Sequence, residues 1–379
     1  MTFDRLFREY SLYKAAGMDH LVFRHSDWMH YLEPLAASHK CAVVQEGVSA
    51  EGRPIFRLTW GTGPIAVLMW SQMHGNEATA SRALCDLFRF LTAENDSLQA
   101  LRDTLSQRFT LHFLPMLNPD GAEIWQRENA LGIDLNRDAL RRTAPESAIL
   151  YQVFQRLQPE IGFNLHDQSD YYSVGNSLRP ATLTLLAPPA DSADTTGHHR
   201  LLAMALVCHM YQSMEQMMPG HTAKWRDDYE PRAFGEFFQQ SGMATVLVEA
   251  GGYPGDSERN MARRLIFALL LSSLAEGVPH EWNGRVNTPR MEAWSQAHRE
   301  WLQQTYRSIA LNRENGMFSR IEREKSMVFN HRTYLTDSGY RWQYRFANGV
   351  LEKELIKEAT GDLGPFGSYE ECEPNTPAL

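Results

Sequence analysis

The chain has 379 residues, of which 43% are hydrophobic and 22% are charged. This composition is ordinary for a globular protein, so it argues against long disorder and is compatible with one large domain or two. The formal net charge of −9 disfavours a nucleic-acid-binding role, because phosphate contacts need clustered Lys and Arg.

Four cysteines are scattered without a Cys-x-x-Cys pair, and we interpret them as reduced, mostly buried thiols. The N-terminal residues lack the apolar core of a secretion signal. The longest apolar helix that we predict, Leu265–Leu274, is far shorter than the roughly 20 residues that a membrane span needs. We therefore expect a soluble, cytoplasmic protein with no membrane partner.

In chain order, residues 1–40 predict helices. Alternating residues in Cys41–Gly47 and Ile55–Gly61 predict two strands of a hairpin. The apolar run Ile65–Trp70 predicts a strand that is buried on both faces. Ala78–Leu91 follows with the apolar spacing of a helix.

Strands and helices alternate through the rest of this region. Asn118-Pro119-Asp120-Gly121 predicts a turn, and residues 122–145 show no clear regular element. This alternation predicts an α/β fold, with a mostly parallel mixed central sheet and helices on both faces. The further predicted strands are Phe109–Leu117, Ile161–Leu165, Thr182–Leu186 and Ala244–Val248, and the further helices are Glu146–Leu157, His199–Met217, Ala233–Gln240 and about Ser257 to Ala275.

Three regions differ in character along the chain. Residues 1–40 form a predicted helical segment, and residues 41–279 carry the alternating strand and helix pattern of an α/β domain. Residues 280–379 predict a C-terminal appendage, with a helix around Arg290–Ser308, a strand-like piece at Tyr340–Phe346 and an acidic tail rich in Pro and Gly.

The polar turn after Ile65–Trp70 carries His74 and Glu77, three positions apart. Such a pair is a weak signal alone, and His30 and Glu33 repeat the spacing inside a predicted helix. The first pair differs because it follows a buried strand, and the carboxyl ends of strands are where open α/β sheets bind ligands.

His166 and Glu249 also follow buried strands, so we expect both side chains at the same sheet edge as His74. Two imidazoles and one carboxylate leave a fourth position open for water, which is the pattern of catalytic rather than structural zinc. The sequence thus predicts one zinc ion per chain, held by His74, Glu77 and His166, with Glu249 as a neighbouring base.

Five motifs occur in the order found in zinc metallocarboxypeptidases, which the chain resembles from about residue 41 to 277. The resemblance includes an Arg-x-Asn-Ala-x-Gly-x-Asp-Leu-Asn-Arg pattern over residues 127–137. The motifs are His74-Gly75-Asn76-Glu77, Asn118-Pro119-Asp120-Gly121, Asp134-Leu135-Asn136-Arg137, Asn164-Leu165-His166 and Val248-Glu249.

The resemblance implies the zinc carboxypeptidase fold and the same three zinc ligands. It further implies that Glu249 is the general base and acid, and that Arg127 stabilises the oxyanion. Asn136 and Arg137 inherit the grip on the substrate's terminal carboxylate, and Asp134 orients the first zinc-binding histidine.

A phenol donor is usual in these enzymes shortly before the catalytic glutamate. Tyr229 is our candidate, in the polar and aromatic segment Trp225–Tyr229, and Tyr253 and Tyr171/Tyr172 stay open as alternatives.

We therefore expect hydrolysis of a C-terminal peptide bond by a metal-activated water. The alternative is an N-acyl-amino-acid deacylase of the aspartoacylase or succinylglutamate desuccinylase type, because these relatives share His-Gly-Asn-Glu and Asp-Leu-Asn-Arg. In either case the substrate, a peptide or an N-acyl amino acid, carries a free carboxylate. A non-catalytic binding protein that kept the fold is a third, less favoured hypothesis.

Overall fold

The computed structural model describes residues 2–170, 172–280, 294–314, 341–347 and 350–357. The chain divides into two compact units, Met1–Arg313 and Glu314–Leu379. In the second unit, the strands β11 (Arg341–Ala347) and β12 (Val350–Lys357) pair as an antiparallel hairpin. The predicted Pro- and Gly-rich tail lies outside the described residues.

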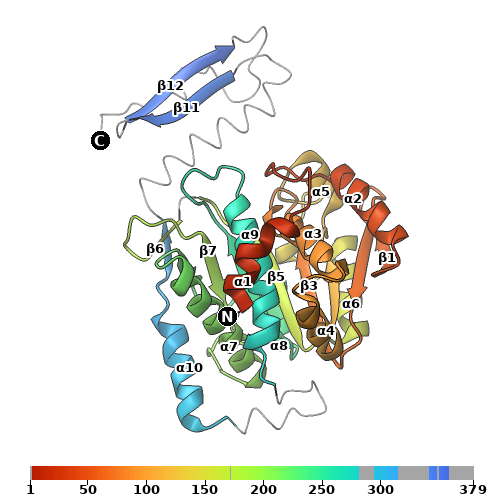
Figure 1. The fold of residues 1–379 in the computed structure, drawn as a ribbon, viewed down its shortest axis with the longest axis vertical. Coiled ribbons are helices and arrows are strands. Elements are labelled where there is room, and N and C mark those ends of the chain that lie inside the picture. The colour runs from red at the N-terminus through yellow and green to blue at the C-terminus, as the bar shows by residue number, and fades with distance from the viewer. Residues whose placement is uncertain (1, 171, 281–293, 315–340, 348–349, 358–379) are drawn as a thin grey trace. The chain divides into compact units, whose positions relative to one another are not determined.

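The first unit is built on an eight-stranded sheet with the order β1-β2-β4-β3-β5-β9-β7-β8 (Figure 1). Its centre, from β4 through β3 and β5 to β9, is parallel. The pairs β1–β2, β2–β4 and β7–β9 are antiparallel. The strands are Ala42–Val48 (β1), Pro54–Trp60 (β2), Ile65–Ser71 (β3), Phe109–Leu114 (β4), Ile161–Asp167 (β5), Leu183–Leu186 (β7), Thr222–Lys224 (β8) and Ala244–Ala250 (β9), and the short strands β6 (Tyr172–Val174) and β10 (Asn312–Glu314) pair with each other.

Helices cover both faces of this sheet, and the two faces belong to different hydrophobic clusters. Val67 and Met69 of β3 belong to the cluster that α1, α3, α7 and α9 help to form. Leu68 and Trp70 belong to the cluster that α6 and α8 help to form. The helices are Thr2–Glu9 (α1), His25–Ala37 (α2), Thr79–Thr92 (α3), Gln99–Arg108 (α4), Pro119–Ile124 (α5), Pro145–Leu157 (α6), His198–Met217 (α7), Phe234–Gln240 (α8), Asn260–Ser272 (α9) and Gln296–Ser308 (α10), with short helical turns at Tyr10–Leu12 (η1), Leu135–Arg137 (η2) and Ser273–Gly277 (η3).

The predicted α/β class and mixed sheet are confirmed. The run Ile65–Trp70 is apolar throughout because alternate side chains enter two cores. The predicted turn at residues 118–121 is wrong, since these residues open α5. Asn118 caps this helix by accepting a hydrogen bond from Gly121 N, and Pro119 occupies its first turn, where its missing N–H is harmless.

In the described part of the chain, no helix is both long and apolar enough to cross a bilayer. The three cysteines that fall within it, Cys41, Cys85 and Cys208, are all free and buried.

A buried ion pair joins α3 to α9 beneath the sheet. Asp86 accepts two hydrogen bonds from the Arg263 guanidinium, at 2.7 and 2.5 Å, and both side chains are fully buried. The same carboxylate accepts from the Tyr10 hydroxyl and the Ala15 amide, at 2.8 and 2.7 Å. One carboxylate therefore joins the N-terminal helical segment to the domain that carries the sheet.

We predict that Asp86→Ala lowers the free energy of unfolding by about 3–5 kcal/mol, because it leaves the Arg263 charge buried and unpaired. Urea denaturation followed by circular dichroism measures the loss. The control is Asp4→Ala, which breaks a pair whose arginine side chain is 75% exposed. Its expected effect is below about 1 kcal/mol, and equal losses in both variants would contradict the prediction.

Candidate active site

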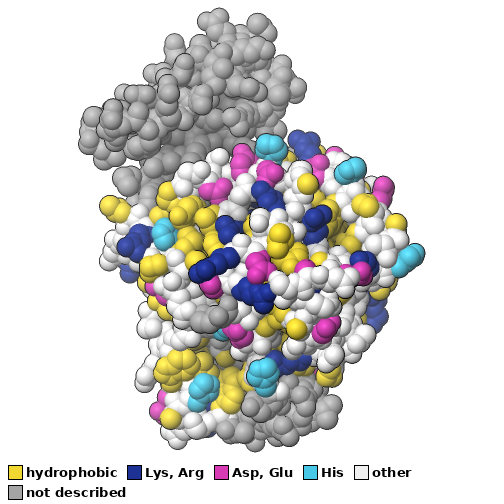
Figure 2. Space-filling model, in the orientation of Figure 1, with side chains coloured by type: hydrophobic (Ala, Val, Ile, Leu, Met, Phe, Trp, Pro, Cys, Tyr) yellow, Lys and Arg dark blue, Asp and Glu magenta, His cyan; other side chains and the backbone are white. Residues whose placement is uncertain are grey.

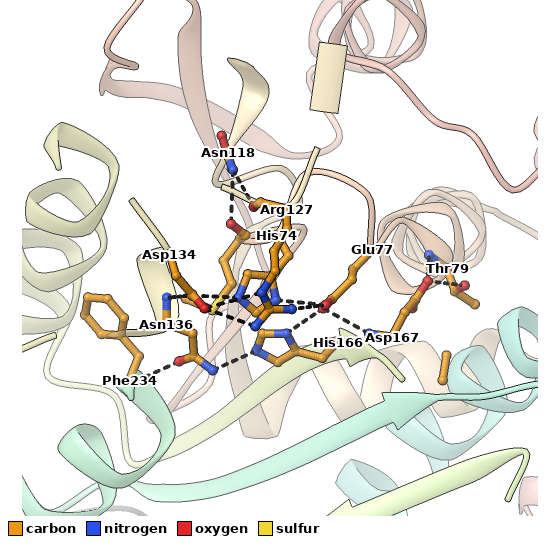
Figure 3. Close-up of polar contacts among 12 residues, drawn as sticks. His74, Glu77, Thr79, Asn118, Arg127, Asp134, Asn136, His166, Asp167 and Phe234 are labelled. Atoms are coloured by element: carbon orange, nitrogen blue, oxygen red, sulfur yellow. Dashed lines mark hydrogen bonds and ion pairs between the residues drawn. The ribbon is translucent and has the colours of Figure 1, made fainter. Parts of the chain in front are cut away.

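Three side chains converge where the parallel strands β3 and β5 end (Figure 3). His74 and Glu77 lie in the turn between β3 and α3, and His166 is the second-last residue of β5. Their ligand atoms all lie within 4.8 Å of one another, and all three residues are buried. By contrast, His30 and Glu33 are exposed on α2, so the repeated spacing there is an ordinary helix surface.

Glu77 lies between the two imidazoles and contacts both. Its Oε2 lies 2.7 Å from Nδ1 of His166, and its Oε1 lies 2.9 Å from Nδ1 of His74. Burial alone would raise the pKa of Glu77, but the charges of His74 and His166 hold it well below its ordinary value. Burial also opposes a charged His74, yet Glu77 raises the pKa of this imidazole to about 9. The Glu77 carboxylate is therefore ionised, and positive charge beside it stabilises it.

The orientation of His74 suits a bound cation. Nε2 of His74 lies 2.9 Å from Oδ1 of Asp134. In the neutral imidazole, which is the form that binds a metal, this carboxylate holds the proton on Nε2 and leaves a lone pair on Nδ1. Within the described residues, this Nδ1 has no hydrogen-bond partner, although it lies close to an oxygen of Glu77. In this neutral form, Nδ1 and the Glu77 oxygen are two acceptor atoms that face each other, so a cation fits between them in place of the proton. Two nitrogen ligands and a carboxylate are the donors that zinc takes in catalytic sites.

Arg127 lies beside the same cluster. Its Nη1 donates to Oε1 of Glu77 at 2.9 Å and its Nη2 donates to Oδ2 of Asp134 at 3.1 Å. The side chain is 41% exposed, so the guanidinium lies at the edge of the buried cluster and contacts solvent. Asn118 fixes the backbone here, because its Nδ2 donates to the carbonyls of Met73 and Arg127, each at 3.2 Å.

Glu249 lies opposite His166, since the two residues are register partners in the parallel pairing of β5 and β9. Burial, followed by the negative charge of Glu77, raises the pKa of Glu249 to about 8. The charges of His74 and Arg127 act in the other direction. A cation at the ligand cluster would also favour the ionised carboxylate.

The two residues expected to bind a terminal carboxylate follow Asp134 on η2. Asn136 is held on both sides, because its Oδ1 accepts from Phe234 N at 3.0 Å and its Nδ2 lies 3.4 Å from Nε2 of His166. Arg137 is 43% exposed, with Nη1 donating to the Asn136 carbonyl at 2.7 Å and Nε lying 3.8 Å from Oε2 of Glu230.

The candidate tyrosines occupy different positions. Tyr229 is half-buried and directly precedes Glu230, which lies beside Arg137. The Tyr172 ring packs edge-on against Trp225, and the Tyr253 ring packs against His221. Tyr171 lies outside the described residues.

A second layer of contacts, which our sequence reasoning missed, lies behind the ligands. Oδ2 of Asp167 accepts from the Thr79 hydroxyl at 2.7 Å and lies 3.4 Å from Nη1 of Arg259. The Arg259 guanidinium also donates to the carbonyls of Gln168 and Ala250, at 2.8 and 3.1 Å. It thus joins the ends of β5 and β9 just beyond His166 and Glu249. In the sequence, only the position of Asp167 directly after His166 could have indicated that Asp167 supports the site.

Comparison with known proteins points in the same direction as these contacts. A family model described as zinc carboxypeptidase matches residues 27–161. Residues 27–161 are therefore similar to the zinc carboxypeptidase family. The match includes His74, Glu77, Arg127 and the 134–137 motif, whereas His166 and Glu249 lie beyond it.

Individual carboxypeptidases match the chain over shorter stretches. Probable carboxypeptidase 2 of Trichophyton verrucosum is 27% identical over 114 residues, which cover 30% of this chain and 20% of that protein. The human carboxypeptidase N catalytic chain is 32% identical over 111 residues, covering 24% of each chain. The matched stretches therefore span a quarter or less of these two relatives.

The fold also resembles solved structures. A metallo-carboxypeptidase from Burkholderia cenocepacia superposes with a TM-score of 0.55 at 18% identity, covering 66% of this chain and 68% of that one. At this identity the likeness concerns the fold. Zinc is the metal of the family, and the donor set of His74, Glu77 and His166 fits it.

We predict that Asp134→Asn weakens zinc binding by about 10–100-fold, because an amide no longer holds the His74 proton on Nε2 as a carboxylate does. Competition with a chelating dye measures the dissociation constant. Asp103→Asn, at an exposed carboxylate on α4, is the control and is expected to bind zinc as the parent does. Equal affinities for the parent and Asp134→Asn would contradict the prediction.

We also predict a pH effect on the stability of the metal-free protein. The pKa of Glu249 is higher in the folded state than its ordinary value of 4.5, so the folded state binds this proton more tightly. The resulting stabilisation is present at low pH and is lost as the pH rises through about 8. Glu249→Gln removes this dependence.

Urea denaturation of the metal-free parent and Glu249→Gln at pH 5.5 and pH 8.5 tests the effect. The parent should lose about 1–3 kcal/mol more than the variant between these two pH values, since one pH unit of displacement corresponds to about 1.4 kcal/mol. Parallel losses would show that Glu249 titrates normally.

Proposed function

We propose that this protein is a zinc-dependent carboxypeptidase, which hydrolyses the C-terminal peptide bond of its substrate. The observation that carries the proposal is the cluster of His74, Glu77 and His166, with Glu249 opposite His166 and Arg127 beside Glu77. The carboxypeptidases among the relatives support this class of reaction.

Each residue has a defined part in the proposed reaction. Zinc held by His74, Glu77 and His166 would supply a Lewis acid to the reacting groups. Glu249 takes a proton from the attacking water and later gives it to the leaving amine. Arg127 offers N–H donors and positive charge to the developing oxyanion, once it exchanges its hydrogen bonds to Glu77 and Asp134 for the substrate.

Arg137, with Asn136 beside it, is proposed to select the C-terminus of the substrate by binding its carboxylate. A guanidinium can bind a carboxylate through two parallel hydrogen bonds, which a lysine cannot copy. The partial exposure of Arg137 suits contact with an incoming substrate. Tyr229 is the proposed phenol donor, because the next residue, Glu230, lies 3.8 Å from the Arg137 guanidinium.

The deacylase alternative rests on Gly75 and Asn76 between the first two ligands. Packing accounts for Gly75, since a Cβ there would lie 2.0 Å from the carbonyl carbon of Gly121 in α5. Only Asn76, which is exposed, then favours the deacylase reading. The carboxypeptidase reading therefore leads.

The proposed substrate is a peptide with a free carboxylate, and a cytoplasmic location stays a prediction. Figure 2 shows basic and acidic side chains mixed over one face of the described residues. This mixed surface suits short peptides that are recognised at their ends, and not a polyanion bound along its length.

We predict that the zinc-loaded protein shortens peptides with free C-termini and leaves matched C-terminal amides intact. A ladder assay by mass spectrometry measures both. Glu249→Gln should lower kcat by at least about 100-fold, because general base catalysis contributes about 10²–10⁴-fold. Its zinc content should equal that of the parent.

The remaining outcomes separate the hypotheses. Turnover of N-acetyl or N-succinyl amino acids without peptide cleavage would support the deacylase instead. Equal cleavage of free and amidated peptides would overturn the role of Arg137. A protein that acts on neither substrate set, and whose Glu249→Gln variant binds peptides equally well, would be a binding protein.

A further inference from the structure

The helix α10 and the residues up to Arg313 are part of the first unit and pack against α7 and β8. In Figure 1, α10 lies beside α7. Leu302, Tyr306 and Ile309 are buried, with 1–3% of each residue exposed. The chain then runs along β8, where Lys224 N donates to the Ala310 carbonyl at 2.8 Å. This part of the chain follows the family-matched residues by more than a hundred positions and still belongs to the same unit.

The Tyr306 hydroxyl reaches a carboxylate in the segment that follows β8. It donates to Oδ1 of Asp227 at 2.8 Å. Burial, with the Asp227 charge, raises the pKa of Tyr306 well above its ordinary value, so the hydroxyl keeps its proton. Asp227 also accepts from Nζ of Lys224 at 2.6 Å, and this ammonium lies 4.5 Å from the centre of the Tyr306 ring. Arg200 is a third neighbour, 3.7 Å from Oδ1 of Asp227. Tyr306, Lys224 and Arg200 together therefore fix the position of this carboxylate.

Asp227 lies in residues 225–233, the segment between β8 and α8, which leads directly to the residues of the candidate substrate site. Glu230 lies 3.8 Å from the Arg137 guanidinium. The carbonyl of Arg232 accepts from Ala139 N at 3.0 Å. Phe234 N donates to Oδ1 of Asn136, also at 3.0 Å. The segment has no regular secondary structure, so its position depends on contacts at its two ends.

We propose that Tyr306 is a positioning residue for substrate binding, which acts through Asp227 to hold residues 225–233 against Asn136 and Arg137. This inference rests on the proposed carboxypeptidase function and adds α10 to the parts that the function needs. A side chain that contacts a binding segment, and not the substrate itself, affects the affinity for substrate more than the chemical step.

The test compares Tyr306→Phe with the parent in the full-length, zinc-loaded protein. The variant keeps the ring over Lys224 and removes only the hydroxyl. We expect KM for a peptide with a free C-terminus to rise on the order of tenfold, since hydrogen bonds to a charged group are among the stronger ones in proteins. We expect kcat to stay within about twofold and zinc affinity to stay unchanged, because no contact with the ligands is lost.

Tyr13→Phe is the matched control. Tyr13 is also buried, and its hydroxyl donates to Asp96 at the same distance of 2.8 Å. Asp96 lies shortly before α4 in the sequence. The KM of Tyr13→Phe should equal that of the parent. An equal rise of KM in both variants would overturn the inference, because general destabilisation would then explain the effect.

Two further measurements keep the inference testable if Tyr306→Phe is unstable or if the parent cleaves no peptide. Amide hydrogen exchange should speed up in residues 225–233 of Tyr306→Phe, and Asp227→Asn should produce the same pattern. Combining the two substitutions should add little to the exchange of this segment, since both act on the same Tyr306–Asp227 hydrogen bond. Unchanged exchange in this segment overturns the positioning role, whereas an inactive parent with altered exchange overturns only the proposed function.

Discussion

The buried negative charge of Glu77 is the constraint on which the site depends. A carboxylate in this environment needs positive charge close by, because burial without pairing costs several kcal/mol. His74 and His166 approach it from two strand ends, and Arg127 approaches from the segment after α5. The parallel centre of the sheet makes this possible, since β3, β5 and β9 all end at one edge.

Much of this arrangement could be predicted from the sequence. The strand before His74 is apolar at every position because two cores share its side chains, and such a run is easy to recognise. The strands before His166 and Glu249 have the same character, so the three strand ends could be matched without a structure. Asn118 was harder, because Asn-Pro-Asp-Gly is typical of turns and also opens helices.

The supporting contacts could not be predicted in this way. Arg259 reaches Gln168 across 91 positions, and Tyr306 reaches Asp227 across 79. No local pattern encodes such pairs, since each depends on where the complete chain places two distant segments. The helix α4 was missed for another reason: its sequence is mostly polar and gives a weak apolar period.

Gly75 has a consequence for the evolution and redesign of this site. Its amide donates to the Arg127 carbonyl at 3.3 Å, and a Cβ on it would also lie 2.5 Å from the carbonyl oxygen of Gln126. The turn that carries His74 and Glu77 and the backbone at Gln126 and Arg127 are therefore in van der Waals contact. Even an alanine at position 75 would push the two apart, so a mutational path that alters one must alter the other at the same step. We therefore expect residues 74–77 and the backbone at Gln126 and Arg127 to change together among descendants of this chain.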